Sequence, residues 1–220
     1  RIETSPGNYD FEWLIDILER AKKAGISICL ATSTAVQPAW LSKLHPEILP
    51  TDAHGQKKRF GGRVKYCPNS AQFKLYAGRL VRKMAEIAQQ YDHVVMWHIG
   101  NEYDNYCYCE TCKDKFQEWV QVRYHSVEKV NEKWNLRFWG HGITAFDEIE
   151  IPDFRTENWE MGGIVRTNFQ TMHLDYMRFM NDAILSCYLN EKAIVNEMTP
   201  NIPVTTNFMG AFKPLNYFLW

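Results

Sequence analysis

The residues best suited to chemistry are an adjacent pair, Asn101 and Glu102, which follows a short apolar run. A carboxylic acid can give and take a proton, and the amide beside it offers a donor and an acceptor that suit a sugar hydroxyl. Flat apolar faces on which sugar rings stack could come from Trp40, Trp97 and Trp139. The alternatives are a capping or salt-bridging role for Glu102 and ordinary core packing for each Trp. The pattern indicates a glycosidase-like site.

Four of the six cysteines could converge on one metal ion: Cys67, Cys107, Cys109 and Cys112. The last three form a C-x-C-x-x-C motif, and the first would come from a loop before the preceding helix. Four thiolates are typical of a closed, structural zinc site, which has no open position to activate water. The alternatives are free buried thiols or a disulfide between two of them. Cys29 and Cys187 lie in apolar patterns, and we expect both in the core.

Alternating helical and strand patterns must position these residues. Apolar residues at helical spacing predict helices over residues 11–21, 75–88, from 116 onward, and 165–190. Short apolar runs predict buried strands at 26–31, 93–99 and 203–208. Helices between such strands indicate an α/β fold whose parallel sheet is covered on its faces. Catalytic groups of such folds collect at the carboxyl ends of strands, which is where Glu102 lies.

Two long connections, residues 32–69 and 135–163, follow elements that end at one edge of this sheet. Connections of such length are more often functional than slack. We therefore expect them to contribute to a site.

Composition narrows the function classes. The chain has 45% apolar residues, enough for a sizeable core, and 25 basic against 26 acidic residues, well mixed along the sequence. This balance excludes the electrostatic footprint of a nucleic-acid-binding protein, and no apolar run is long enough to span a membrane. We expect no nucleic-acid or membrane partner and a cytoplasmic protein. The start at Arg1 rather than Met indicates a piece of a longer chain.

Five stretches in order resemble the family 42 glycoside hydrolases over essentially the whole chain: LATSTAVQPAWLSKLHPEILPTDAHG, RVKYCPNS, WHIGNEYDNYCYCETC, FQEWVQVRYHSVEKVNEKWNLRFWG and PVTTNFMGAFKPLNYFLW. Members of that family are β-galactosidases with a (β/α)8 TIM-barrel catalytic domain. The resemblance implies that residues 1–220 are an incomplete TIM barrel, from about the end of strand 2 to the start of helix 5. It also implies an inserted zinc-binding loop around residues 67–112.

The resemblance implies roles for single residues. Glu102 matches the general acid/base at the end of strand 4, and Asn101 matches its partner that contacts the sugar. Arg63 in RVKYC matches a substrate-binding arginine, and Trp139 in RFWG matches an aromatic of the sugar pocket. The four clustered cysteines match the ligands of the family's structural zinc.

The implied activity is hydrolysis of terminal non-reducing β-D-galactose residues by a retaining, two-carboxylate mechanism. The family's nucleophile belongs to strand 7, beyond Trp220, so this chain alone is expected to be inactive. Four other carboxylates are predicted in a loop or on helical stretches and match no strand-end motif: Glu157, Glu160, Glu191 and Glu197. The full-length protein is expected to bind a galactoside and to form a homo-oligomer, a trimer.

Other functions remain open at this point. One is activity on a related pyranoside, such as an α-L-arabinopyranoside. Another is a sugar-binding relative without a nucleophile, and a third is a non-catalytic interaction module stapled by zinc. A nucleic-acid zinc module is disfavoured because YDNYCYCETC is acidic on balance.

Overall fold

A computed structural model describes residues 2–162, 164–210 and 215–220. The strands are β1 (Glu3–Ser5), β2 (Asn8–Tyr9), β3 (Ile28–Ala31), β4 (Val94–His98), β5 (Asn158–Met161), β6 (Ile164–Thr167) and β7 (Val204–Thr205). The α-helices are α1 (Glu12–Lys23), α2 (Ala39–Leu44), α3 (Ala71–Ala88), α4 (Glu110–Tyr124), α5 (Val127–Lys133) and α6 (Gln170–Met198). Short 3-10 turns are η1 (Pro46–Ile48), η2 (Phe138–Gly140), η3 (Phe146–Glu148) and η4 (Tyr217–Leu219). Arg1 and part of the last family-like stretch, residues 211–214, lie outside the described residues.

The central sheet is parallel, in the order β3, β4, β7. Trp97 in the middle strand pairs with Leu30 on one side and Val204 on the other. All three strands lie within the runs that the sequence analysis assigned to strands. The α/β class with a parallel sheet is therefore confirmed, while the described residues of this chain form an open sheet and not a closed barrel.

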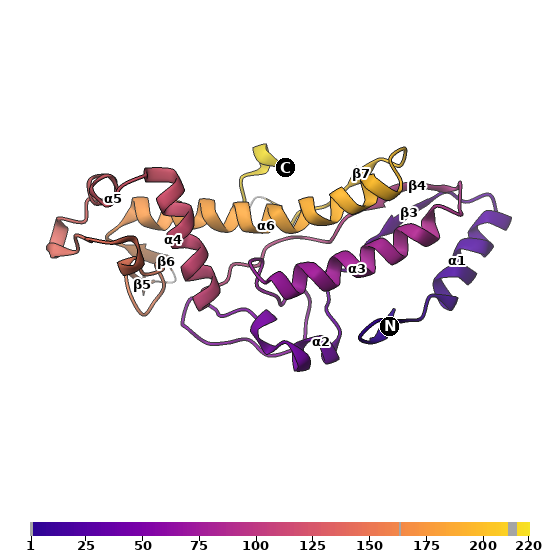
Figure 1. The fold of residues 1–220 in the computed structure, drawn as a ribbon, viewed down its shortest axis with the longest axis horizontal. Coiled ribbons are helices and arrows are strands. Elements are labelled where there is room, and N and C mark those ends of the chain that lie inside the picture. The colour runs from indigo at the N-terminus through magenta and orange to yellow at the C-terminus, as the bar shows by residue number, and fades with distance from the viewer. Residues whose placement is uncertain (1, 163, 211–214) are drawn as a thin grey trace.

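Helices α3 and α6 pack side by side and run in the same direction (Figure 1). Near the start of α3, Lys74 Nζ donates to Ser186 Oγ in the middle of α6 at 2.8 Å, and further along both helices Arg82 forms an ion pair with Glu197 at 2.8 Å. Each helix precedes a strand of the sheet, so the parallel helices are those of successive β/α units. Gly78 allows the close approach, since a Cβ there would lie 3.1 Å from Ile194 Cδ1.

The long helix α6 joins two separate cores (Figure 1). The first core lies between the sheet and helices α1, α3 and α6, with Trp97 and Ile184 fully buried. The second lies between α4, α5 and the first half of α6, with Phe116 and Met180 fully buried. The chain passes from the first core to the second between Tyr103 and Cys107, immediately after Glu102.

Three expectations need correction. Cys29 is exposed, because side chains alternate along a strand: Leu30 faces the helices, and Cys29 faces the side of the sheet that the described elements leave open. The helix expected from residue 165 begins at Gln170 and continues to Met198, since residues 164–167 form the second strand of a β5–β6 hairpin. Glu160 consequently lies on a strand, β5, and not in a loop or helix. Cys187 is buried as expected.

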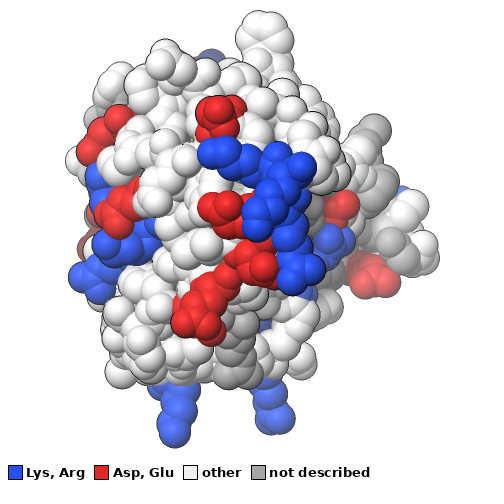
Figure 2. Space-filling view, turned by 90° about the vertical axis from the view of Figure 1, so that its right-hand side faces the viewer, with Lys and Arg blue, Asp and Glu red and all other residues white. Residues whose placement is uncertain are grey.

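The surface at the α1 end of the molecule carries basic and acidic side chains next to one another (Figure 2). Arg20 and Asp16, one turn apart on α1, form an ion pair at 2.9 Å there. This face thus shows no large patch of one sign. Within the described parts of the chain, no helix combines the length and the apolar character that a bilayer crossing requires.

Candidate active site and cysteine cluster

The turn after β4 carries the predicted acid/base. Glu102 lies in the left-handed region with φ of 48°, and Gly100 has φ of 60°. Left-handed backbone is uncommon for residues other than glycine, and it persists where the surroundings hold it. Gly100 also leaves room for Tyr103, because a Cβ at this position would lie 2.2 Å from the Tyr103 hydroxyl oxygen. The turn therefore depends on a glycine two residues before Glu102.

The turn directly follows β4 and is hydrogen-bonded to residues just after the carboxyl ends of β3 and β7. The Gly100 N–H donates to Thr32 Oγ1 at 2.9 Å, directly after β3. The Glu102 N–H donates to Asn207 Oδ1 at 3.2 Å, in the segment after β7. The backbone from Gly100 to Glu102 is thus tied to residues that follow both neighbouring strands.

The Glu102 carboxylate meets two of the predicted site residues. The Arg63 guanidinium forms an ion pair with Glu102 Oε2, and Asn101 Nδ2 donates to the same oxygen at 3.3 Å. The Glu102 side chain is 24% exposed. A partly exposed carboxyl group beside a cation at the carboxyl end of a parallel sheet can exchange protons with a molecule bound there.

The ring contacts of Trp139 in the described structure are with Phe138 and His141, and not with these three residues. Trp139 lies in η2 with φ of 56°, is 68% exposed, and stacks on Phe138 with ring centroids 4.6 Å apart. This turn belongs to the rim of the second core. The other two candidate tryptophans serve packing: Trp97 is fully buried, and Trp40 donates to a backbone carbonyl.

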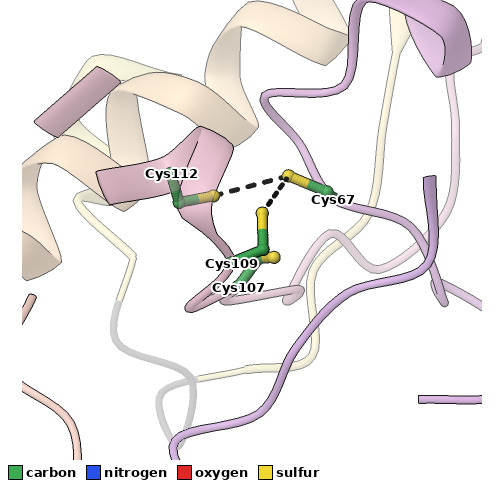
Figure 3. Close-up of side chains that lie close together, drawn as sticks. All are labelled: Cys67, Cys107, Cys109 and Cys112. Carbon is green, nitrogen blue, oxygen red and sulfur yellow. Dashed lines mark hydrogen bonds between the residues drawn. The ribbon is translucent and has the colours of Figure 1, made fainter. Parts of the chain in front are cut away.

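The four predicted metal ligands come together (Figure 3). Their Sγ atoms all lie within 4.8 Å of one another, and Cys67 Sγ is 3.4 Å from Cys112 Sγ and 3.7 Å from Cys109 Sγ. Sulfurs at the corners of a tetrahedron with metal–sulfur bonds of about 2.3 Å are ~3.8 Å apart. No disulfide links the cysteines in the described part of the chain. The cluster therefore has the dimensions of a four-coordinate metal site.

Neighbouring groups suit thiolate ligands. Asn69 Nδ2 donates to Cys112 Sγ at 3.3 Å, and the Thr51 N–H donates to Cys107 Sγ at 3.5 Å. N–H donors that orient the ligand atoms are usual around metal sites. The residues present fit a metal ion held by four thiolates.

The cysteines connect two loops. Cys67 lies in the loop before α3, which also carries Arg63, while Cys107 and Cys109 lie in the segment that follows Glu102. Cys112 is in the first turn of α4. A metal ion here would fix the Arg63 loop to the Glu102 segment.

One residue of the site region was missed by the sequence analysis as a candidate. Glu191 in α6 is fully buried and accepts hydrogen bonds from Thr32 Oγ1 at 2.6 Å and Thr34 Oγ1 at 2.9 Å. Burial raises its pKa to about 7, although these two hydrogen bonds and the nearby Tyr103 hydroxyl favour the charged form. The sequence did contain a sign that Glu191 is buried, because it lies on the same helix face as Val195, four residues later, and both are buried in α6.

Known proteins resemble this chain over its whole length. The sequence profile of glycoside hydrolase family 42, described as beta-galactosidase, matches residues 1–220. Beta-galactosidase BgaP from Planococcus sp. (strain L4) is 43% identical over 212 residues, which are 96% of this chain and 31% of that protein. Beta-galactosidase bgaB from Geobacillus kaustophilus is 43% identical over 227 residues, 100% of this chain and 32% of its own length.

A crystal structure of beta-galactosidase from Bacillus circulans sp. alkalophilus superposes with a TM-score of 0.95 at 45% identity. The match covers 100% of this chain and 32% of that one. The chain thus spans about a third of the length of these relatives. Because the family profile covers every residue of the sequence, the chain belongs to glycoside hydrolase family 42, the β-galactosidase family.

Proposed function

We propose that the full-length protein is a retaining β-galactosidase that releases terminal non-reducing β-D-galactose, and that this chain supplies its general acid/base, Glu102. The observation that carries the proposal is the convergence of Arg63 and Asn101 on one oxygen of the Glu102 carboxylate at the end of β4. The relatives that match the whole chain are named beta-galactosidases, which supports the same assignment.

The proposed mechanism uses Glu102 twice. As an acid it protonates the glycosidic oxygen while a second carboxylate, in the remainder of the protein, attacks the anomeric carbon. As a base it then removes a proton from the water that hydrolyses the galactosyl-enzyme. Its partial exposure leaves the carboxyl group accessible to both the leaving group and water.

The neighbouring residues have binding roles in this proposal. Arg63 and Asn101 present a cation and an amide that can hydrogen-bond sugar hydroxyls beside the scissile bond. Trp139 offers an exposed indole face for a sugar or an aglycone, as the family resemblance implies. Trp139 contacts Phe138 and His141 and not Glu102 in the described structure. Its role in sugar binding therefore depends on how the complete protein assembles.

For the cysteine cluster we propose structural zinc, bound by Cys67, Cys107, Cys109 and Cys112. The four-sulfur donor set and its spacing favour zinc among the biological divalent ions. Zinc would supply rigidity to the loops of the site and no chemistry.

For the whole protein we propose a (β/α)8 TIM barrel that contains residues 1–220 as one contiguous part. The zinc-binding segment around residues 67–112 is not a single loop, because α3 and β4 lie within it, and its ligands come from its two ends. The three parallel strands with helices on one face are compatible with a segment of such a barrel. The assembly proposed from the family resemblance is a homotrimer, and light scattering of the purified full-length protein would measure it.

The test of the function uses two galactosides that differ in their leaving groups. In full-length Glu102→Gln, kcat/KM for an alkyl galactoside is expected to fall by about 10²–10⁴-fold, because a poor leaving group needs protonation. With a dinitrophenyl galactoside, kcat/KM should change little, while kcat falls and a burst of phenolate shows that the galactosyl-enzyme accumulates. Equal losses of kcat/KM on both substrates would rule out Glu102 as the acid.

A further inference from the structure

A buried chain of hydrogen bonds runs from helix α6 to the turn that carries Glu102. The Thr32 hydroxyl donates to Glu191 Oε2 at 2.6 Å and accepts from the Gly100 N–H at 2.9 Å. Thr32 and Glu191 are at most 1% exposed. Two sequence-distant residues are thereby connected to the backbone two positions before Glu102.

We propose that Glu191 and Thr32 are positioning residues for the general acid/base Glu102, holding the left-handed turn from which its side chain projects. This inference rests on the proposed function, because it assigns these residues to the same reaction. Neither residue touches the site of the reacting atoms, so their effect passes through the backbone of Gly100.

The direction of the hydrogen bonds explains why both residues are needed. A hydroxyl group has a single proton, and the Thr32 proton points to Glu191, which leaves the Thr32 lone pairs facing the Gly100 N–H. Without the carboxylate acceptor, the proton would turn to Thr34 Oγ1, which lies 3.3 Å from Thr32 Oγ1, and the Thr32 lone pairs would lose the orientation that faces the Gly100 N–H. Glu191 thus fixes the orientation in which Thr32 acts as an acceptor.

The free-energy cost of burying the Glu191 carboxyl group indicates that this residue has a specific role. Placing a carboxyl group in a dry core is unfavourable unless it is well hydrogen-bonded, and an apolar residue would fill the same face of α6 more cheaply. Thr34 supplies a second donor to Glu191 at 2.9 Å. The group is therefore kept in place by two hydroxyls, of which only that of Thr32 also contacts the turn.

The hydrogen bonds matter because the turn that they hold has a strained backbone. Glu102 is held in the left-handed region, where a residue other than glycine remains only if its surroundings fix it. If the Gly100 N–H loses its partner, the turn can relax and move the carboxyl group. A displacement of about 1 Å at a catalytic group can cost ~10²-fold in rate.

Thr34 provides a matched control. Thr32→Val and Thr34→Val each remove one buried hydroxyl from Glu191 with almost no change in shape, but only the first leaves Gly100 without its acceptor. In the full-length protein, we expect Thr32→Val to lower kcat/KM at least about tenfold more for an alkyl galactoside than for a dinitrophenyl galactoside. For Thr34→Val we expect equal, small changes on both substrates.

Two further variants separate positioning from folding. Thr32→Ser keeps the hydroxyl and is expected to restore the wild-type ratio of the two kcat/KM values. If Thr32→Val does not fold, Glu191→Met tests the same chain with an apolar residue of similar length. In Glu191→Met, kcat/KM should fall more for the alkyl than for the dinitrophenyl galactoside, as in Thr32→Val. Glu191→Gln retains a carbonyl acceptor for Thr32, so its ratio of the two kcat/KM values should stay close to that of wild type.

The outcomes distinguish this inference from the function on which it rests. Uniform losses on both substrates in Thr32→Val or Glu191→Met, alongside a strong leaving-group dependence in Glu102→Gln, would overturn the positioning roles and leave the acid/base assignment intact. Absence of leaving-group dependence in Glu102→Gln itself would overturn the proposed function instead.

Discussion

At the scale of single residues, the site combines an accessible carboxyl group with a buried one. Glu102 lies beside Arg63 at the open end of the sheet, while Glu191 lies in the core under the same turn. The first has the surroundings of a group that exchanges protons with a ligand. The second has those of a group that holds structure, and its burial gives it a measurable effect on stability.

The stability of the protein is predicted to depend on pH through Glu191. Burial raises the pKa of Glu191 to about 7 in the folded protein, from an ordinary value of 4.5 that applies when the chain is unfolded. The folded state therefore binds the proton more tightly, and this contribution is fully present below about pH 4.5 and is lost as the pH rises to about 7. The difference of about 2.5 units corresponds to about 3 kcal/mol.

Thermal unfolding of wild type and Glu191→Gln at pH 5 and pH 8 measures this effect. The stability of wild type relative to the variant is expected to be greater at pH 5 than at pH 8. The nearby ionisable groups stay neutral in this range, because burial raises the pKa of Cys187 to about 12 and raises those of Tyr66 and Tyr103 well above 10. The same difference between the two proteins at both pH values would show that Glu191 titrates normally when folded.

The sequence revealed Glu102 and not Glu191, for a physical reason. Glu102 follows a strand directly, and the carboxyl end of a parallel strand marks a site regardless of the rest of the fold. The importance of Glu191 depends on which strand end lies over its helix, and this is a tertiary contact across 159 residues. Its place on an apolar helix face indicated burial but could not indicate the partner.

At the scale of elements, the loops are held by the cysteine cluster and the helices by their packing. The loop before α3 and the segment after β4 meet at the four cysteines. The segment after β4 contains Glu102 and leads into α4. Tyr176 on α6 adds a hydrogen bond to the Cys107 carbonyl at 2.5 Å. The cluster is therefore continuous with the second core.

Removing the metal is predicted to loosen these loops without changing the chemistry. Full-length protein should contain about one zinc per chain, and Cys109→Ser or a strong chelator should lower the thermal midpoint by at least about 5 °C. Activity should fall as a consequence, while the pH dependence of the remaining activity stays as in wild type, because zinc does not activate water in a closed site.

Cys29→Ser is the control for loss of a thiol, since Cys29 lies outside the four-cysteine cluster. It should retain about one zinc per chain. Elemental analysis that finds no zinc, or a pH profile displaced by zinc removal, would contradict a purely structural metal.

Local sequence patterns were sufficient to locate some of the helices and strands but not others. The apolar runs located all three parallel strands, because buried strands need continuous apolar residues. The start of α4 at Glu110 was not evident, since its first turn carries polar residues and a cysteine ligand instead of an apolar stripe. The β5–β6 hairpin was not predicted, because its residues are largely exposed: β5 falls within the predicted connection 135–163, and most of β6 within the helix predicted from residue 165.

At the scale of the whole molecule, two cores share the long helix α6 (Figure 1). The proposed active site lies where the chain passes from the first core to the second. The side of the sheet on which Cys29 lies is open in the described structure. In a closed barrel this side would face the interior, which the remaining strands would complete. The proposed second carboxylate would come from those strands.

The central claim is that Glu102 is the acid/base of a retaining galactosidase. The most direct measurement uses full-length Glu102→Ala with a dinitrophenyl β-galactoside and azide, followed by NMR of the product. Azide needs no general base, so it can attack the galactosyl-enzyme, release the carboxylate nucleophile, and form a carbon–nitrogen bond on the β face.

The account predicts that azide accelerates turnover and that the product is β-galactosyl azide. An α-galactosyl azide would contradict it, since that product arises by direct displacement in an enzyme that has lost its nucleophile, and would assign that role to Glu102. Full activity of the variant without azide would equally contradict the claim.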